Sequence, residues 1–468
     1  MKTPFLSRSS RSAGQRCPEN QERGVTMVLV AVSMIAILGI AALSIDAVTL
    51  YLAREEAQRT ADTAALAAAR VLSISGITGD PQNATSSWSA ACTTATEIAT
   101  VIAQQNTIAG QALPPAQITV TFPNNPGCGS APVFGVNPEV TVRVQRTNLP
   151  SFFARIWGRS SNSVSASATA EAYNSSNSGA FAANGMIPIQ PRCVKPWLIP
   201  NRDPTGAGGV FVDPSTGDIN KKGVLQLGGG VIGESFTITS ACKPGAADCT
   251  IATGNLVDNP PNSTGGNIDY VPADIQASPY TAVPTTTSTC PNTNDFQKAI
   301  DGCDQQTQYQ CGVPNGANID LADWAPVTPT VLTGDTGTAV QCLIHSSTGG
   351  QDVLRLTSGP SAVFPFQIQA GLDNPIVKLG TGVNNDDIIT SSSSIVNIPI
   401  YDSAAASTFA TDHQQVTILG FLQVFINRLD VAGNPNVTVL NVSGCSNNAP
   451  GASVSGTSPV PVRLITPP

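Results

Sequence analysis

The stretch VTMVLVAVSMIAILGIAALSI (residues 25–45) contains no charged residue. As a helix, its 21 residues would be about 31 Å long, which matches the hydrocarbon core of a bilayer. A cleaved signal peptide is the alternative, but its apolar core spans only about 7–15 residues and ends in a small-x-small cleavage site. The sequence AALSIDA (residues 41–47) fits such a site poorly. We therefore expect a retained transmembrane helix over residues 25–45.

The charges before and after this segment differ in sign. Residues 1–24 carry five basic and two acidic residues, whereas the whole chain has a formal net charge of −8. Positive charge before an apolar segment and negative charge after it form the positive-inside pattern. We expect residues 1–24 to be a cytoplasmic basic N-terminus and the bulk of the chain, after Asp46, to be exported.

The chain after the apolar segment is expected to continue as a long alanine-rich helix. No Gly or Pro occurs between Asp46 and Gly76. Small or apolar side chains recur at steps of three or four residues, which places them in one stripe. The stripe comprises Leu50, Ala53, Ala57, Ala61, Ala64, Ala68 and Val71. Because alanines let two backbones approach closely, we expect this stripe to pack against helices of related proteins. A solvated helix of high alanine propensity is the alternative.

Polar pairs on the other faces of this helix are also spaced for contact. Glu55 stands four residues before Arg59, which favours an ion pair, and Gln58 stands four residues before Asp62, which favours a hydrogen bond.

Residues 23–70 closely resemble the N-terminal region of TadE/TadG-like Flp pilus-assembly proteins. The shared marks are Arg23-Gly24, the apolar run, Asp46, Tyr51-Leu52, Gln58, and Asp62 leading into Ala64, Ala65, Leu66, Ala67 and Ala68. The resemblance implies an envelope protein of the machinery that builds Flp pili for tight adherence, and it brings no catalytic residues. Processed prepilins of this system carry Glu at the fifth place after the cleaved glycine, where this chain has Leu29.

The first exported part, residues 46–175, has the pattern of a small α/β module. Residues 88–106 are helix-like, and residues 117–122, 139–147 and 163–173 alternate like half-buried strands. Residues 149–158, LPSFFARIWG, suggest a short helix. We expect helices lying on a three-stranded sheet.

The remainder is expected to be mostly β, so the fold class is α+β. Residues 176–185 have the composition of a linker. Within residues 186–468, the segments 394–402 and 415–430 are the most apolar, and 295–304 suggests a short helix. A strand as apolar as VTILGFLQVFI is typical of a buried position, so we expect this part to have a core of its own.

Eleven cysteines are present, and one, Cys17, precedes the apolar segment. The others are Cys92, Cys128, Cys193, Cys242, Cys249, Cys290, Cys303, Cys311, Cys342 and Cys445. An even number in an exported region favours disulfides formed in an oxidising compartment. Close spacing makes local bridges plausible for Cys242 with Cys249 and for Cys303 with Cys311. Zinc is the alternative, but the chain has no CxxC pair.

Candidate chemistry is sparse, and we expect no catalytic residue, metal site or cofactor. The two histidines, His345 and His413, have no nucleophile elbow such as GxSxG nearby. The segment VDPSTGD (residues 212–218) is similar to a DxSxS metal motif, but Gly217 replaces its second serine, which favours a turn. Calcium held by acidic loops such as 384–387 is an alternative to solvated acidic loops. The sequence pI is near 4.8, so the chain is acidic and lacks the clustered basic residues typical of a nucleic-acid-binding protein.

These observations predict a single-pass protein of the bacterial inner membrane, with its exported part in the periplasm or at the cell surface. Its expected role is non-catalytic assembly of Flp pili, with other Tad proteins as partners through the alanine-rich helix. The alternative is a surface adhesin or glycan-binding module, because polar loops on a disulfide-linked β domain also suit ligand binding.

Overall fold

A computed structural model describes the apolar helix and most of the chain that follows it. The described residues are 22–79, 85–122, 128–129, 137–151, 153, 158, 161–174, 188–205, 209–225, 230–241, 266–273, 281–282, 295–303, 309–311, 318–320, 329–346, 350–356, 366–380, 382–404, 415–445 and 454–465. The expected linker at residues 176–185 lies outside them, as do residues 1–21 of the N-terminus.

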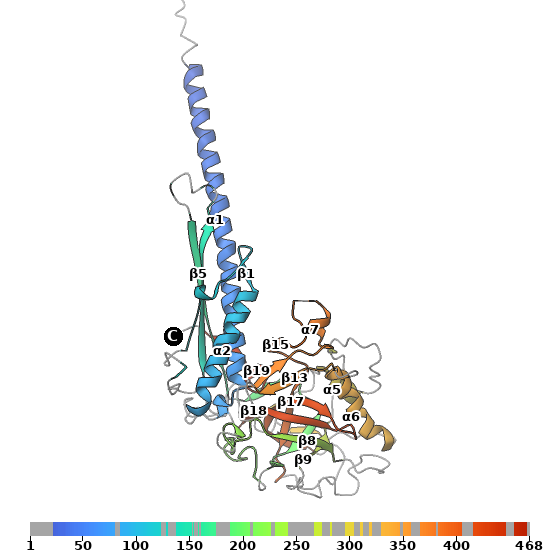
Figure 1. Ribbon diagram of the computed structural model, residues 1–468. Helices are drawn as coiled ribbons and strands as arrows, with labels where there is room; N and C mark the ends of the chain where they lie inside the picture. Colours follow the sequence, from blue (N-terminus) through green and yellow to red (C-terminus); the bar gives the residue numbers. More distant parts are fainter. Residues whose placement is uncertain are drawn as a thin grey trace, which may run out of the picture.

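The longest element is helix α1 (Glu22–Ser73), which runs without interruption through the apolar segment and the alanine-rich segment. Its first half projects free of the body, as Figure 1 shows, and the large apolar side chains from Val25 to Ile45 are exposed. Within the described part of the chain, α1 is the one helix long and apolar enough to cross a membrane. An exposed apolar surface of this length matches lipid rather than water, in line with the expected span.

The second half of α1 lies on a small sheet and beside a second helix, α2 (Thr85–Gln105). The sheet has the antiparallel order β20-β5-β4-β3, with β3 (Ile118–Thr121), β4 (Glu139–Pro150), β5 (Ser161–Ala172) and β20 (Val462–Ile465). The first three strands are those expected from residues 117–173. The fourth strand, β20, comes from far along the chain, so the expectation of a three-stranded sheet is wrong.

Short elements complete this helix–sheet unit. Strands β1 (Thr107–Ile108) and β2 (Gln111–Ala112) form a short hairpin after α2, and each strand has two residues. The 3₁₀ turn η2 (Pro115–Gln117) leads into β3. The 3₁₀ turn η1 (Ile77–Gly79) follows α1. A short helix was expected at residues 149–158. Its first two residues belong to strand β4 instead, and residues 152 and 154–157 lie outside the described residues.

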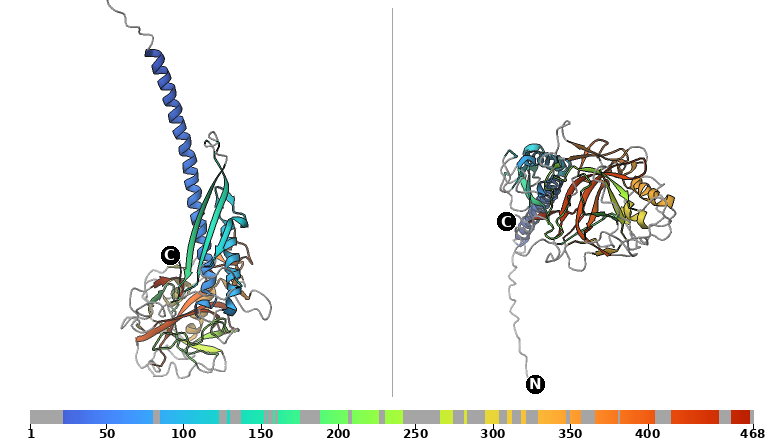
Figure 2. Two further views of the ribbon diagram at one scale, coloured as in Figure 1. Left: turned by 90° about the vertical axis from the view of Figure 1, so that its left-hand side faces the viewer. Right: turned by 90° about the horizontal axis from the view of Figure 1, so that it is seen from below.

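A ring of hydrogen-bonded strands forms the centre of the body. Strands β17, β16, β7, β9, β8 and β18 are neighbours in that order, and β18 pairs again with β17, which closes the ring. Their bounds are β7 (Trp197–Pro200), β8 (Ser235–Ser240), β9 (Asn267–Pro272), β16 (Ile395–Tyr401), β17 (Gln415–Leu429) and β18 (Pro435–Gly444). Closure removes the exposed edges that an open sheet would leave, as in other small barrels. The right-hand view of Figure 2 shows these strands beside the helix–sheet unit.

Smaller elements surround this ring. The strands are β6 (Ile189–Pro191), β10 (Thr281–Ala282), β11 (Gly302–Cys303), β12 (Asn318–Asp320), β13 (Val353–Leu356), β14 (Phe366–Gln369), β15 (Ile388–Ile389) and β19 (Val454–Gly456), and the helices are α5 (Asp295–Asp301), α6 (Pro329–Leu343) and α7 (Pro375–Lys378). Strand β12 pairs with β17, β13-β14-β15 form one sheet, and β6 pairs with β19. Helix α5 agrees with the helix expected at 295–304, and the mixed content confirms the α+β class.

One continuous apolar cluster joins the two units. It runs from Ala53 of α1 through Trp88 of α2 to Phe425 of β17, while a smaller cluster around Phe421 lies within the body alone. Strand β17 thus buries side chains on both faces, which explains its nearly continuous apolar sequence. The smaller cluster lies wholly within residues 186–468, and the main cluster in addition crosses the junction with the helix–sheet unit.

Disulfides connect elements that are distant in sequence. The bonded pairs are Cys92–Cys128, Cys193–Cys303 and Cys311–Cys445, with Cα–Cα distances of 5.3, 4.3 and 5.7 Å. Cys342 is disulfide-bonded as well, and Cys242, Cys249 and Cys290 lie outside the described residues. The expected local bridge between Cys303 and Cys311 is wrong, because each of them bonds to a partner more than a hundred residues away.

Candidate functional site

The alanine stripe of α1 is buried inside this chain. Its five alanines, Ala53, Ala57, Ala61, Ala64 and Ala68, are at most 2% exposed, and Ala65 beside them is fully buried. Helix α1 packs there against α2, β4, β5 and β20. The small side chains let α1 lie close to the sheet. The expectation that the stripe meets helices of other proteins is therefore corrected, since the chain's own elements occupy that face.

Asp46, the first charged residue after the apolar segment, ties α1 to the tip of the β4–β5 hairpin. Its Oδ2 accepts a hydrogen bond from the backbone N–H of Phe153 at 3.0 Å, and the residue is only 3% exposed. A carboxylate that accepts from a backbone N–H forms a charge-assisted bond, which is stronger than a neutral one. Asp46 therefore has a structural partner at the end of the apolar segment.

Gln58 makes a second connection between α1 and the hairpin. Its Nε2 donates to Oδ1 of Asp62 at 2.8 Å, as the spacing predicts, and to the carbonyl oxygen of Ser167 in β5 at 3.3 Å. The exposed pair Glu55 and Arg59 lies with its charged atoms 3.9 Å apart. On the same helix, Oε2 of Glu56 accepts from the N–H of Ala109 in the β1–β2 turn at 2.6 Å.

Asparagines join the base of this unit to the body. The buried side chain of Asn174, just after β5, donates to Oγ1 of Thr78 in η1 at 3.4 Å and to the carbonyl oxygen of Val442 in β18 at 3.4 Å. Asn441 of β18 donates to the carbonyl oxygen of Ser73 at the end of α1. Because buried amides need partners, these bonds fix where β18 meets α1.

Gly76 makes the turn after α1 possible. Its φ is +70°, and a Cβ atom added there would lie 2.9 Å from a side-chain carbon of Val224 and 3.2 Å from one of Ile232. A side chain would therefore be strained by its backbone and would clash with the body.

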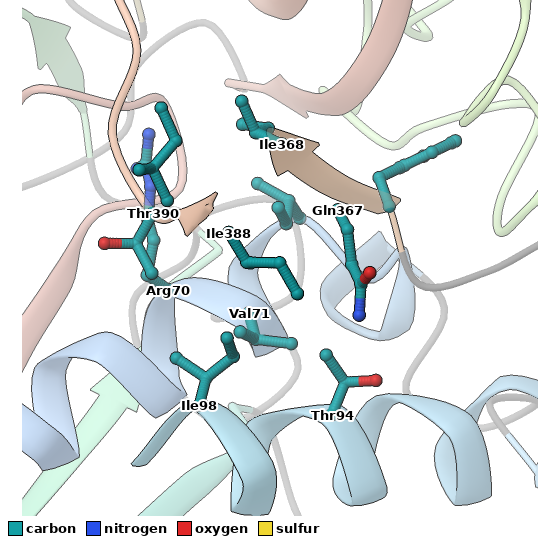
Figure 3. Close-up of a pocket in the computed structure, with 11 residues that line it drawn as sticks. Arg70, Val71, Thr94, Ile98, Gln367, Ile368, Ile388 and Thr390 are labelled. Carbon is teal, nitrogen blue, oxygen red and sulfur yellow. The ribbon is translucent and has the colours of Figure 1, made fainter. Parts of the chain in front are cut away.

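A pocket lies where the two units meet. It has about 330 Å³ of space, part of it open to solvent, and Figure 3 shows side chains entering it from α1, α2 and the β14–β15 strands. Its lining comprises Arg70, Val71, Ile74, Thr94, Ile98, Phe366, Gln367, Ile368, Ile388, Ile389 and Thr390. Burial lowers the pKa of Arg70 to about 10, so the guanidinium remains charged at neutral pH.

The histidine considered in the sequence is a buried residue of the body. Nε2 of His345 lies 3.2 Å from Oγ of Ser393, and its Nδ1 has no hydrogen-bond partner among the described residues. The carboxylate of Asp352, which could have been the acidic partner of such a histidine, accepts hydrogen bonds from Asn374, Ser392 and the N–H of Gly371. Burial lowers the pKa of His345. These residues lack the base-to-carboxylate bond of a triad, and His413 lies outside the described residues.

The VDPSTGD segment forms the turn that its sequence favours. Oδ1 of Asp213 accepts from the N–H groups of Ser215 and Thr216 at 2.8 and 3.1 Å, which is an Asx turn. The hydroxyl of Ser215 also donates to Oδ1 of Asp213, and this bond, followed by the two backbone bonds, lowers the pKa of Asp213. No group of three or more potential metal ligands occurs among the described residues.

A buried pair of carboxylates was not anticipated from the sequence. Glu234, before β8, is 2% exposed and faces Asp203, which forms an ion pair with Lys221. Burial, reinforced by Asp203, raises the pKa of Glu234 to about 7. The three residues are separated in sequence, so no local spacing could have indicated the cluster.

Comparison with known proteins gives a match to a protein-family model. No curated protein and no solved structure matches the chain. The matched part, residues 24–71, covers α1 from its exposed apolar half through the buried alanine stripe. Residues 24–71 match the family described as putative Flp pilus-assembly TadE/G-like, which confirms the resemblance and supports a role in Flp pilus assembly.

Proposed function

We infer that this protein is a membrane-anchored, non-catalytic component of Flp pilus assembly. Residues 25–45 would hold it in the bacterial inner membrane, with the N-terminus inside and the body exported. The continuity of α1 carries this inference, because one rigid helix passes from an exposed apolar half into the core of the body. The match over residues 24–71 supports the pathway.

In this proposal, the helix–sheet unit is a stalk that sets the body at a fixed place relative to the membrane. The burial of the alanine stripe leaves two surfaces of α1 for partners: the apolar half, and an outward face that includes Arg54, Glu55 and Arg59. Other single-span Tad proteins would meet these surfaces. The body would contact pilus or envelope partners.

Deletion and complementation test the proposal. In a strain that lacks the gene, we expect loss of pilus fibres under the electron microscope and recovery with the full chain. A matched version carries a cleavable signal peptide in place of residues 1–45, so that the body is exported without an anchor. We expect this version to accumulate without restoring fibres.

Two outcomes would contradict the proposal. Intact fibres with poor surface attachment in the deletion strain would favour the adhesin alternative. Full recovery of fibres by the unanchored version would show that the span is not required.

A further inference from the structure

The tip of the β4–β5 hairpin is held at the level where the apolar half of α1 ends. The bond from the N–H of Phe153 to Oδ2 of Asp46 is 3.0 Å long, and Asp46 directly follows the uncharged residues 25–45. If those residues fill the hydrocarbon core, Asp46 lies at the boundary between acyl chains and headgroups. Phe153 must then lie at the same boundary.

The lengths of the two elements agree with this placement. The 12 residues of β4 and the 12 of β5 extend about 40 Å, and the Asp46–Ser73 part of α1 rises about 40 Å. Hydrogen bonds join them at the base, from Asn174 to Thr78, and midway, from Gln58 to Ser167. Figure 2 shows the hairpin rising along α1, which extends beyond it.

The side chains at this level have the chemistry of a membrane interface. Phe153 is 36% exposed although it is a large apolar residue. On α1, Val48, Tyr51 and Leu52 are each more than half exposed, within two turns after Asp46. Aromatic side chains are enriched where a bilayer meets water.

We propose that Phe153, between β4 and β5, is a second membrane contact, and that it enters the headgroup region of the phospholipid leaflet that α1 crosses. Exposed Tyr51 and Leu52 lie within two turns of Asp46 on α1. This inference rests on the proposed membrane anchor. A single helix would leave the body free to tilt about its exit point, whereas a helix and a hairpin tip together restrict that tilt.

Tryptophan fluorescence in vesicles tests the contact. Full-length Phe153→Trp protein is reconstituted into phosphatidylcholine vesicles whose acyl chains carry bromine close to the headgroup, and into matched vesicles without bromine. We expect bromine to quench the emission that the introduced tryptophan adds over the wild-type protein. The matched control is Val431→Trp, at a fully exposed position in the β17–β18 turn of the body, which we expect to remain unquenched.

Alkaline carbonate extraction of the same vesicles separates two kinds of failure. In the first, the protein resists extraction but the added emission of Phe153→Trp is as unquenched as that of Val431→Trp. That result would overturn the proposed hairpin contact and would leave the membrane anchor supported. Protein released by carbonate would overturn both. A further variant, Phe153→Trp with Asp46→Ala, should lose quenching while remaining membrane-bound, because the tip is no longer tied to the span.

Discussion

The side-chain amide of Gln58 bridges Asp62 on its own helix and the carbonyl oxygen of Ser167 on β5, at 2.8 and 3.3 Å. Gln58 and Asp62 both lie within residues 24–71, the segment that matches the family model. Their part in this fold is to hold the helix against the hairpin. We predict that Gln58→Ala lowers the free energy of unfolding by about 0.5–1.5 kcal/mol, because a side-chain hydrogen bond is lost.

Hydrogen exchange in detergent measures this prediction, with faster exchange of β5 amides as the expected result. Arg59→Ala is the control, since Arg59 is exposed and its pair with Glu55 is long. Equal exchange in both variants would mean that the amide bridge does not hold the hairpin.

A larger side chain in the alanine stripe should disturb the packing of α1. Ala61 is fully buried, so Ala61→Leu is expected to cost about 1–3 kcal/mol through overpacking. Thermal unfolding in detergent would show a lower transition temperature. The same change at Ala36, exposed in the apolar half of α1, serves as the control. If Ala61→Leu kept full stability but lost co-purifying Tad proteins, the stripe would face a partner.

The stability of the body should depend on pH through Glu234. Its pKa is raised to about 7, so the folded state binds the proton more tightly than the unfolded state does. The resulting stabilisation is fully present below about pH 4.5, the ordinary value, and is lost as pH rises through about 7.

We therefore predict that Glu234→Gln is more stable than the wild type at pH 8, by about 1–3 kcal/mol, with little difference near pH 5. Chemical denaturation at the two pH values measures the effect. Glu97→Gln, exposed on α2, should leave the wild-type pH dependence in place. A pH-independent effect of Glu234→Gln would exclude titration as its cause.

The disulfide between Cys92 and Cys128 should stabilise the helix–sheet unit. It closes a loop with a sequence separation of 36 residues, for which chain entropy gives about 3–4 kcal/mol. We expect Cys92→Ala/Cys128→Ala to unfold at lower temperature, with α2 becoming protease-sensitive first. Cys17→Ala, before the span, is the control. An unchanged transition temperature would argue that α2 is held by packing alone.

Local patterns in the sequence predicted the elements better than their partners. The uncharged run of residues 25–45 and the Gly- and Pro-free stretch after it predicted one long helix, because both signals lie within a few turns. Strands β16 and β17 were expected from their apolar composition. The pairing of strand β20 was not predicted. Its four residues are little buried, so their sequence does not indicate which sheet edge they join.

The same reasoning explains the errors at the candidate site. The alanine stripe predicted close packing. However, the spacing of residues along a helix shows only which face is apolar, and it does not show whether that face packs against the same chain or against another protein. The spacing of Cys303 and Cys311 suggested a local bridge, whereas the strand order brings Cys193 and Cys445 to them. The hydrogen bond that Asp46 accepts from the backbone N–H of Phe153 links residues 107 apart, and no local rule connects such positions.

The pairing of β20 with β5 also has a consequence for how the protein is made. Arg463 binds Glu171 across 292 residues of chain, and its guanidinium lies over the ring of Tyr173, 4.9 Å from the centroid. Until residue 465 has been synthesised, the part of β5 that pairs with β20, Thr169–Ala172, has no strand on that side. If the body is exported as proposed, nascent chains would expose an unpaired β edge at the body end of β5, over Thr169–Ala172, and a chaperone or rapid secretion would be needed to keep neighbouring copies from pairing there first.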